Sequence, residues 1–183
     1  LGSASGELLR QSSESLAGRI GYYDLGGFTL EDAGTENLDT LWLRGGLPRA
    51  YLGADDDQAF IWLQNYVNTF CERDIPRFGI NIPAATIHRF WMMLSHYHGQ
   101  IVNYAELGRS LGVSDMTARR YVDILVSTFM VRLIQPWYVN AGKRLIRHPK
   151  LYIRDSGVFH ELQSIRSPLQ LRTHPKLGAS WEG

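Results

Sequence analysis

The fold is decided by the stretch from Ile101 to Ile134, which reads IVNYAELGRSLGVSDMTARRYVDILVSTFMVRLI. Asn103 is a good N-cap for a helix over about 104–111, and Ser114 is a good N-cap for a longer helix over about 115–129. Gly112 supplies the turn between them, and the small Gly108 suits the point where the two helices cross. This spacing predicts a helix-turn-helix.

The second of these helices separates into an apolar face and a polar face. Asp123 falls on the polar face, where its carboxylate disfavours a nearby phosphate. Short hydroxyls and arginines at the start of such a helix suit contacts with base edges in the major groove of DNA. The expected DNA contacts on this helix are Ser114, Thr117, Arg119 and Arg120. The expected buried stripe consists of Ala118, Tyr121, Val122, Leu125 and Phe129.

Two β-prone segments follow, and a basic turn joins them. Residues 129–134 are apolar and precede Pro136, and the β-prone pattern returns at 151–153. From Lys143 to Arg154 there are five positive residues and no acidic one, which suits contact with phosphates. The expected phosphate contacts are Lys143, Arg144, Arg147 and Lys150. A helix-turn-helix followed by a basic β-hairpin predicts a winged helix over 81–154 and double-stranded DNA as its partner.

Helices are also expected on the N-terminal side of this unit. A helix from Asp57, with an apolar side chain at every third or fourth position, should end at Pro76. Another should begin near Pro83 and bury Phe90 and Trp91, while 7–20 is weakly helical and 21–41 reads as loop and linker. The fold class expected is mainly α with a small β component: a helical linker and lid-like helix, then the winged helix, flanked by partial domains.

Several classes of protein are excluded by composition and by missing motifs. The single cysteine, Cys71, rules out a disulfide framework and is expected to be structural. No P-loop motif, serine elbow or convincing pair of catalytic acids occurs, so no catalytic residue is expected. His96 and His98 read as the surface of a helix end, and no metal site is expected. The apolar runs are too short to span a bilayer, and a cytoplasmic protein without membrane contact is expected.

Charge is distributed unevenly along the chain. The net charge is −7 over 1–75, +2 over 76–130 and +6 over 131–183. A basic C-terminal part can meet an anionic partner such as DNA. An alternative is a docking module without nucleic-acid contact, in which the basic stretch neutralises acids such as those at 55–57. A transcription factor that acts by itself is a third possibility.

Several segments resemble one known family, in order and over nearly the whole chain. They are 41–49 (LWLRGGLPR), 51–52, 72–76 (ERDIP), the helix-turn-helix through Thr117 and Tyr121, 140–145 (NAGKRL), 149–157 (PKLYIRDSG) and 174–178 (HPKLG). The chain resembles prokaryotic AAA-superfamily ATPases that carry a C-terminal domain of unknown function. In that family a P-loop ATPase module precedes a winged helix and a domain that resembles restriction-endonuclease folds.

The resemblance implies that the chain is an internal fragment with four parts. Residues 1–40 would be the tail end of the ATPase module, 41–80 the linker and lid-like helix, 81–154 the winged helix, and 155–183 the start of the nuclease-like domain. It implies nucleotide-sensing roles for Ser3 and Arg19, for which a loop serine and a helix-capping surface arginine are the alternatives. Glu182 would match an acid of the nuclease-like domain, but a lone acid cannot hold a catalytic metal.

The resemblance also implies the cofactors and partners of the parent protein. ATP and Mg²⁺ are expected for the full-length parent, and none for this fragment, which should neither hydrolyse ATP nor cut DNA. Besides double-stranded DNA, the expected partner is the chain's own ATPase module, and a homo-oligomer of further copies is left open. The nucleotide state of the ATPase module would then change how the winged helix is presented to DNA.

Overall fold

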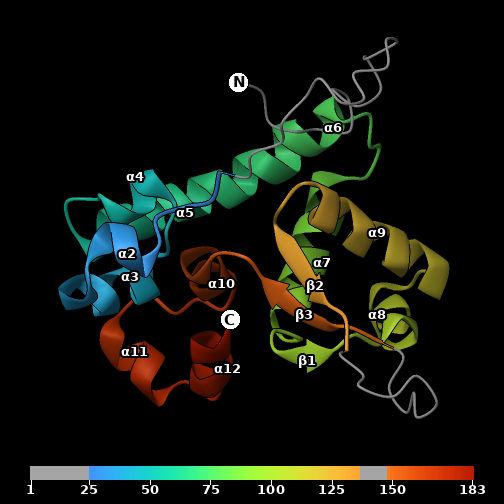
Figure 1. Cartoon of the computed structure of the whole chain (residues 1–183). Coiled ribbons are helices and arrows are strands. Elements are labelled where there is room, and N and C mark those ends of the chain that lie inside the picture. Colours follow the sequence, from blue (N-terminus) through green and yellow to red (C-terminus); the bar gives the residue numbers. More distant parts are fainter. Residues whose placement is uncertain (1–24, 137–147) are drawn as a thin grey trace, which may run out of the picture.

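The computed structural model describes residues 25–136 and 148–183 (Figure 1). Along the described residues, the helical segments and strands come in the following order: α2 (Leu30–Ala33), the 3₁₀ helix η1 (Thr35–Asn37), α3 (Leu38–Arg44), α4 (Pro48–Tyr51), α5 (Asp56–Thr69), the π-helix η2 (Phe70–Asp74), α6 (Ile75–Arg77), α7 (Ala84–Ser95), β1 (Gln100–Ile101), α8 (Tyr104–Leu111), α9 (Asp115–Ser127), β2 (Val131–Ile134), β3 (Lys150–Ile153) and α10 (Ser156–Leu162). Two short helices complete the chain, α11 (Pro168–Thr173) and α12 (Leu177–Glu182). The expected class, mainly α with a small β component, is confirmed.

The long helix α5 is shorter than its sequence predicts, but two further helical segments follow it without a break. Asp55 caps its start by accepting a hydrogen bond from the backbone N–H of Gln58, and Leu63 and Val67 are buried. The expected end of this helix at Pro76 is wrong for α5, which ends at Thr69, although the chain stays helical through η2 and α6 to Arg77. Proline fits in the first turn of a helix, where its missing N–H has no intrahelical partner. Pro76 occupies that position in α6.

The segment expected to be loop and linker contains short helices instead. Thr29 caps α2 in a capping box with Asp32, and α3 follows directly after η1. Helices of four to seven residues are too short to produce a recognisable apolar period. Gly45, with φ of +79°, ends α3, and Pro48 opens α4.

A small antiparallel sheet joins α7 to the helix-turn-helix. Its strand order is β1-β3-β2, with Leu151 opposite both Gln100 and Leu133. The strands lie close to the expected positions. Phe129, however, does not belong to the buried stripe of α9: it is 43% exposed and has a positive φ of 63°, at the turn that separates α9 from β2. Ile124 is buried instead.

One continuous core connects the helices on both sides of the sheet. Its largest fully buried side chains include Trp91, Phe90 and Phe159. Helix α10 packs against α3, α5 and α7, so chain segments far apart in sequence share this core (Figure 1). α8 and α9 lie on the opposite side of the molecule from α2, α3 and α4 (Figure 1). The domain boundaries expected after 40, 80 and 154 remain a prediction.

Candidate nucleic-acid interface

Helices α8 and α9 form the predicted helix-turn-helix. Asn103 caps α8 by accepting from the N–H of Glu106 at 3.2 Å, and α8 ends at Gly112, which has the left-handed conformation. The N–H of Val113 donates back to the carbonyl of Gly108 at 2.9 Å, which closes the turn. A Cβ at Gly108 would lie only 2.8 Å from the Val113 carbonyl oxygen, so the close approach of the two helices requires glycine here.

The hydroxyls expected to contact DNA are engaged within their own helix. Ser114 caps α9, since its Oγ accepts from the N–H of Thr117 at 3.1 Å. The two side-chain oxygens of Ser114 and Thr117 are also 2.9 Å apart and hydrogen-bonded. These hydrogen bonds therefore stabilise the N-terminus of α9. A base could bind Ser114 or Thr117 only through hydrogen-bonding groups of the two hydroxyls that these local bonds do not use.

Arg119 and Arg120 are both exposed but have different surroundings. The guanidinium of Arg119 lies 5.8 Å from the ring centre of Tyr104, at cation–π distance, which holds it against the start of α8. Burial raises the pKa of Tyr104, Asp123 raises it further and Arg119 lowers it. Arg120 has no hydrogen-bond or ion-pair partner among residues 25–136 and 148–183. It is thus the less constrained of the two arginines.

An open groove of about 560 Å³ lies beside the start of α9. Tyr104 and Arg119 line it together with His148, whose ring centre is 6.4 Å from that of Tyr104. The remaining lining residues are Ile101, Val102, Asn103, Ala105, Asp115 and Met116. The groove therefore adjoins His148, two residues before β3, as well as the first turns of α9.

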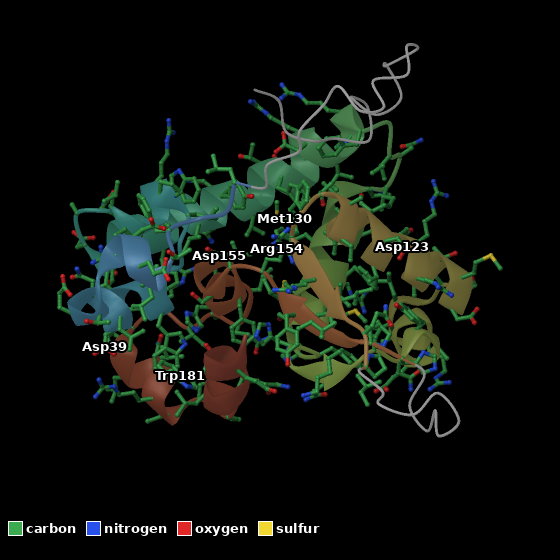
Figure 2. All side chains as sticks on the ribbon, viewed as in Figure 1. Asp39, Asp123, Met130, Arg154, Asp155 and Trp181 are labelled. Carbon is green, nitrogen blue, oxygen red and sulfur yellow. The ribbon has the colours of Figure 1, made fainter. Side chains whose placement is uncertain are left out.

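Met116 is a residue that the sequence analysis did not single out. Its side chain is 79% exposed although it is apolar, and it occupies the first turn of α9, four residues before Arg120. The sequence did contain a signal for Met116, because it is an apolar residue that lies outside the buried stripe of an amphipathic helix. Asp123 continues this exposed side of α9 (Figure 2).

Lys150 has an intramolecular partner. Its Nζ lies 3.2 Å from Oε1 of Glu182, at the end of α12, and the two side chains are 48% and 54% exposed. The hydrogen bond with Glu182 raises the pKa of Lys150. The acid that the family resemblance assigns to a nuclease-like domain is thus an ion-pair partner in this structure. The other expected phosphate contacts, Lys143, Arg144 and Arg147, and the candidate nucleotide-sensing residues Ser3 and Arg19, lie outside the described residues.

Of the two histidines that follow α7, one differs from the expectation. His96 is exposed, as predicted, but the prediction that His98 is a surface residue is wrong, because it is only 2% exposed. Its Nδ1 accepts from the N–H of Ile153 at 3.0 Å, and its ring packs 4.3 Å from that of Phe159. The chain turns inward after His96 to begin the sheet, and this buries His98. The spacing of apolar residues along α7 does not predict this change in direction of the chain.

Other reactive groups in the described part of the chain have structural surroundings. Cys71 is buried in the core, and burial raises the pKa of its thiol to about 12. Over 25–136 and 148–183, no three His, Cys, Asp or Glu side chains gather closely enough to hold a metal ion. Nor does any helix in those ranges have the length and apolar character needed to cross a bilayer.

The fold and this surface define a mainly helical protein that carries a helix-turn-helix beside a small antiparallel sheet. The chain belongs to the family described as Domain of unknown function (DUF8612), whose model matches residues 35–169. Two mycobacterial relatives, Uncharacterized protein Rv2008c of Mycobacterium tuberculosis and Uncharacterized protein Mb2031c of Mycobacterium bovis, are each 51% identical to it over 183 residues. The alignment covers the whole chain but 42% of each relative. No solved structure gives a significant match.

Proposed function

We propose that this chain is a DNA-binding module in which residues 81–154 act as a winged helix and α9 enters the major groove of duplex DNA. The element order α7-β1-α8-α9-β2-β3, with β3 between β1 and β2 in the sheet, supports this proposal. In a winged helix, this order of elements presents the second helix of the helix-turn-helix, and the β-hairpin after it, to DNA.

One observation carries the proposal: α9 is buried on one side and presents arginines on the other. Ala118 and Val122 are fully buried, while Arg119 and Arg120 are exposed at the end of α9 where base edges are normally read. The crossing at Gly108 brings α8 close behind α9, which leaves the arginine side of α9 as an outer surface. Arg109, exposed in the last turn of α8, adds a third positive charge.

A larger role follows from the family resemblance. In the longer protein the winged helix would be coupled to an AAA-type ATPase module that binds ATP and Mg²⁺, with Ser3 and Arg19 as sensors of the nucleotide. The chain spans about two fifths of the length of its curated relatives. The part of each relative outside the alignment is therefore long enough to hold such a module. Measurement of ATP hydrolysis by a full-length relative, with and without duplex DNA, tests this coupling. Absence of any ATPase activity would contradict it.

The alternative function is a docking module without nucleic-acid contact. The ion pair between Lys150 and Glu182 favours it, because one expected phosphate contact already has a carboxylate partner. The acids of the N-terminal part are also engaged locally: Asp56 pairs with Arg44 at 2.6 Å, and Asp55 caps α5. These two acids therefore have partners other than the basic stretch, so of these contacts only the Lys150–Glu182 pair favours the alternative.

Fluorescence anisotropy with a labelled duplex of about 30 base pairs separates the two functions. For DNA binding, affinity should fall steeply between roughly 50 and 200 mM salt, since phosphate contacts release counterions. The double variant Arg119→Ala/Arg120→Ala should weaken binding at least about tenfold. Arg172→Ala is the matched control, because Arg172 is exposed on α11 and pairs with Asp39 at 3.7 Å, away from α9. Salt-independent binding, or no binding at low salt, contradicts the DNA function.

A further inference from the structure

One side of α9 carries an exposed stripe whose members repeat at helical spacing. Met116, Arg120 and Asp123 stand at positions i, i+4 and i+7, so they share one side of the helix. All three are exposed, and Met116 reaches 79%. The stripe therefore combines an apolar group, a cation and an anion in that order along α9.

The neighbouring groups of α9 are less available for contact with a base. Ser114 and Thr117 hydrogen-bond to each other at 2.9 Å and begin the helix. The Arg119 guanidinium lies over the ring of Tyr104. Within the described ranges, neither Met116 nor Arg120 has a side-chain hydrogen bond or ion pair. These two side chains can thus contact a base without first breaking a side-chain hydrogen bond or ion pair with the described residues.

Their chemistry matches two different bases. The 5-methyl group of thymine is the apolar group that DNA presents in the major groove, and an exposed thioether can cover it. Arginine binds O6 and N7 of guanine with two parallel hydrogen bonds. Four residues of helix rise about 6 Å, which is close to two base-pair steps of roughly 3.4 Å each. Asp123, one turn beyond Arg120, repels phosphate and limits how far the DNA backbone can follow α9.

We infer that Met116 and Arg120 are the base-reading pair of α9 and that the chain selects duplexes with a thymine about two base pairs from a guanine. This inference rests on the proposed DNA-binding function. It assigns the exposed methionine to a DNA base, whereas the docking alternative would assign it to an apolar patch of a partner protein. The two assignments differ in what the thymine methyl group contributes.

The test begins with selection of duplexes from a pool with about 20 random base pairs by the whole 183-residue chain. The selected duplexes should share a thymine and a guanine two steps apart. Replacing that thymine with uracil removes only the methyl group and should weaken wild-type binding about fourfold, the value of one buried methyl group. Met116→Ala should bind the thymine and uracil duplexes equally, and Arg120→Ala should lose the preference for guanine.

Met92→Ala is the matched control, because Met92 is also exposed, at 41%, but lies on α7. It should keep the full difference between thymine and uracil. A uracil penalty that is the same in Met116→Ala and wild type overturns the inference, because a group other than Met116 then contacts the thymine methyl. Selection without a thymine preference overturns it as well, while DNA binding itself stands. If the folded wild-type chain captures no duplex from the pool at low salt, the inference and the proposed function both fail.

Discussion

The side-chain oxygen of Ser180 lies 2.7 Å from Nε2 of His160. On the other side of the ring, Nδ1 of His160 is 2.9 Å from the carbonyl oxygen of Leu43, which can only accept, so Nδ1 carries the proton. Ser180 therefore donates to Nε2 and in turn accepts from the indole N–H of Trp42 at 2.9 Å. This chain of three hydrogen bonds joins α12, α10 and α3, and Trp181 adds an edge-to-face contact with Trp42. Figure 2 shows Trp181 at this end of the molecule.

The first prediction is that Ser180→Ala destabilises the fold. The substitution leaves Trp42 Nε1 and His160 Nε2 without a partner in a buried site, at a cost of roughly 2 to 4 kcal/mol. Urea unfolding followed by tryptophan fluorescence measures the change. Ser110→Ala, on the exposed side of α8, should change the free energy of unfolding by less than about 0.5 kcal/mol. Equal effects of the two substitutions would count against the network.

The second prediction concerns acid. Burial lowers the pKa of both His98 and His160 to about 4, below the ordinary value of 6.5 that each would have in the unfolded chain. The unfolded state then binds more protons between pH 6.5 and 4, so stability is complete above pH 6.5 and is lost as pH falls towards 4. Each histidine contributes a slope of up to about 1.4 kcal/mol per pH unit in that window.

Denaturant unfolding at several pH values measures this slope. His98→Gln should reduce the slope, whereas Ser110→Ala, which removes no titratable group, should leave it unchanged. A wild-type slope that survives loss of His98 undiminished would show that burial of this ring does not drive the acid sensitivity.

The third prediction tests the contact between the end of β3 and the turn after α3. One oxygen of Asp155 accepts from the N–H of Gly46 at 2.9 Å, and the other caps α10 by accepting from Val158 at 2.9 Å. Asp155→Ala should cost roughly 2 to 4 kcal/mol, because a helix cap is lost and a partly buried N–H loses its partner. Thermal unfolding compared with Asp57→Ala, an exposed acid in α5, is the measurement. A similar small shift for both variants would contradict it.

The fourth prediction is a gain in stability from Ser164→Gly. Ser164 follows α10 with φ of 57°, a conformation in which a Cβ is strained and glycine is not. The N–H of Ile165 bonds to the carbonyl of His160 at 2.8 Å, so the backbone must keep this geometry. Glycine should stabilise by about 0.5 to 1 kcal/mol, measured by the urea midpoint. Ser164→Ala retains the Cβ and should give no gain; an equal gain would point to another cause.

The fifth prediction links the C-terminal helix to DNA binding. Glu182→Gln removes the carboxylate that pairs with Lys150 and frees this cation for phosphate. Duplex affinity should rise about two- to threefold at low salt, and the salt dependence should become steeper by up to about one phosphate contact. Glu31→Gln, an exposed position on α2, is the control for the change in net charge. Unchanged affinity in Glu182→Gln would mean that Lys150 does not meet DNA.

Local pattern accounts for what was predicted well. Helix α8 was expected over about 104–111 and spans Tyr104–Leu111, because Asn103 and Gly112 mark its ends within the sequence itself. The errors have physical reasons too. Phe129 follows the apolar period of α9, but the helix has already ended at Ser127 and the chain turns there. The prediction for His98 failed because burial depends on which elements pack around it.

For the candidate site, the sequence predicted the helix α9 and its exposed arginines, but the structure changes which of the predicted side chains are available for contact. Arg120 is free within the described part of the chain, whereas Ser114 and Thr117 are engaged in capping and Lys150 is paired. Capping can be read from the order of residues, but the pairing of Lys150 joins positions 32 residues apart in sequence. No period or local motif connects them.

The sequence by itself determined the helices with strong caps and regular apolar stripes, because such helices depend on residues within one or two turns of each other. It therefore determined the helix-turn-helix and its arginine-bearing side. Only the tertiary structure decided the buried polar partners. Trp42 meets Ser180 across 138 positions, and Asp155 meets Gly46 across 109. A buried polar group must find a partner, but which one it finds is set by the packing of the whole core.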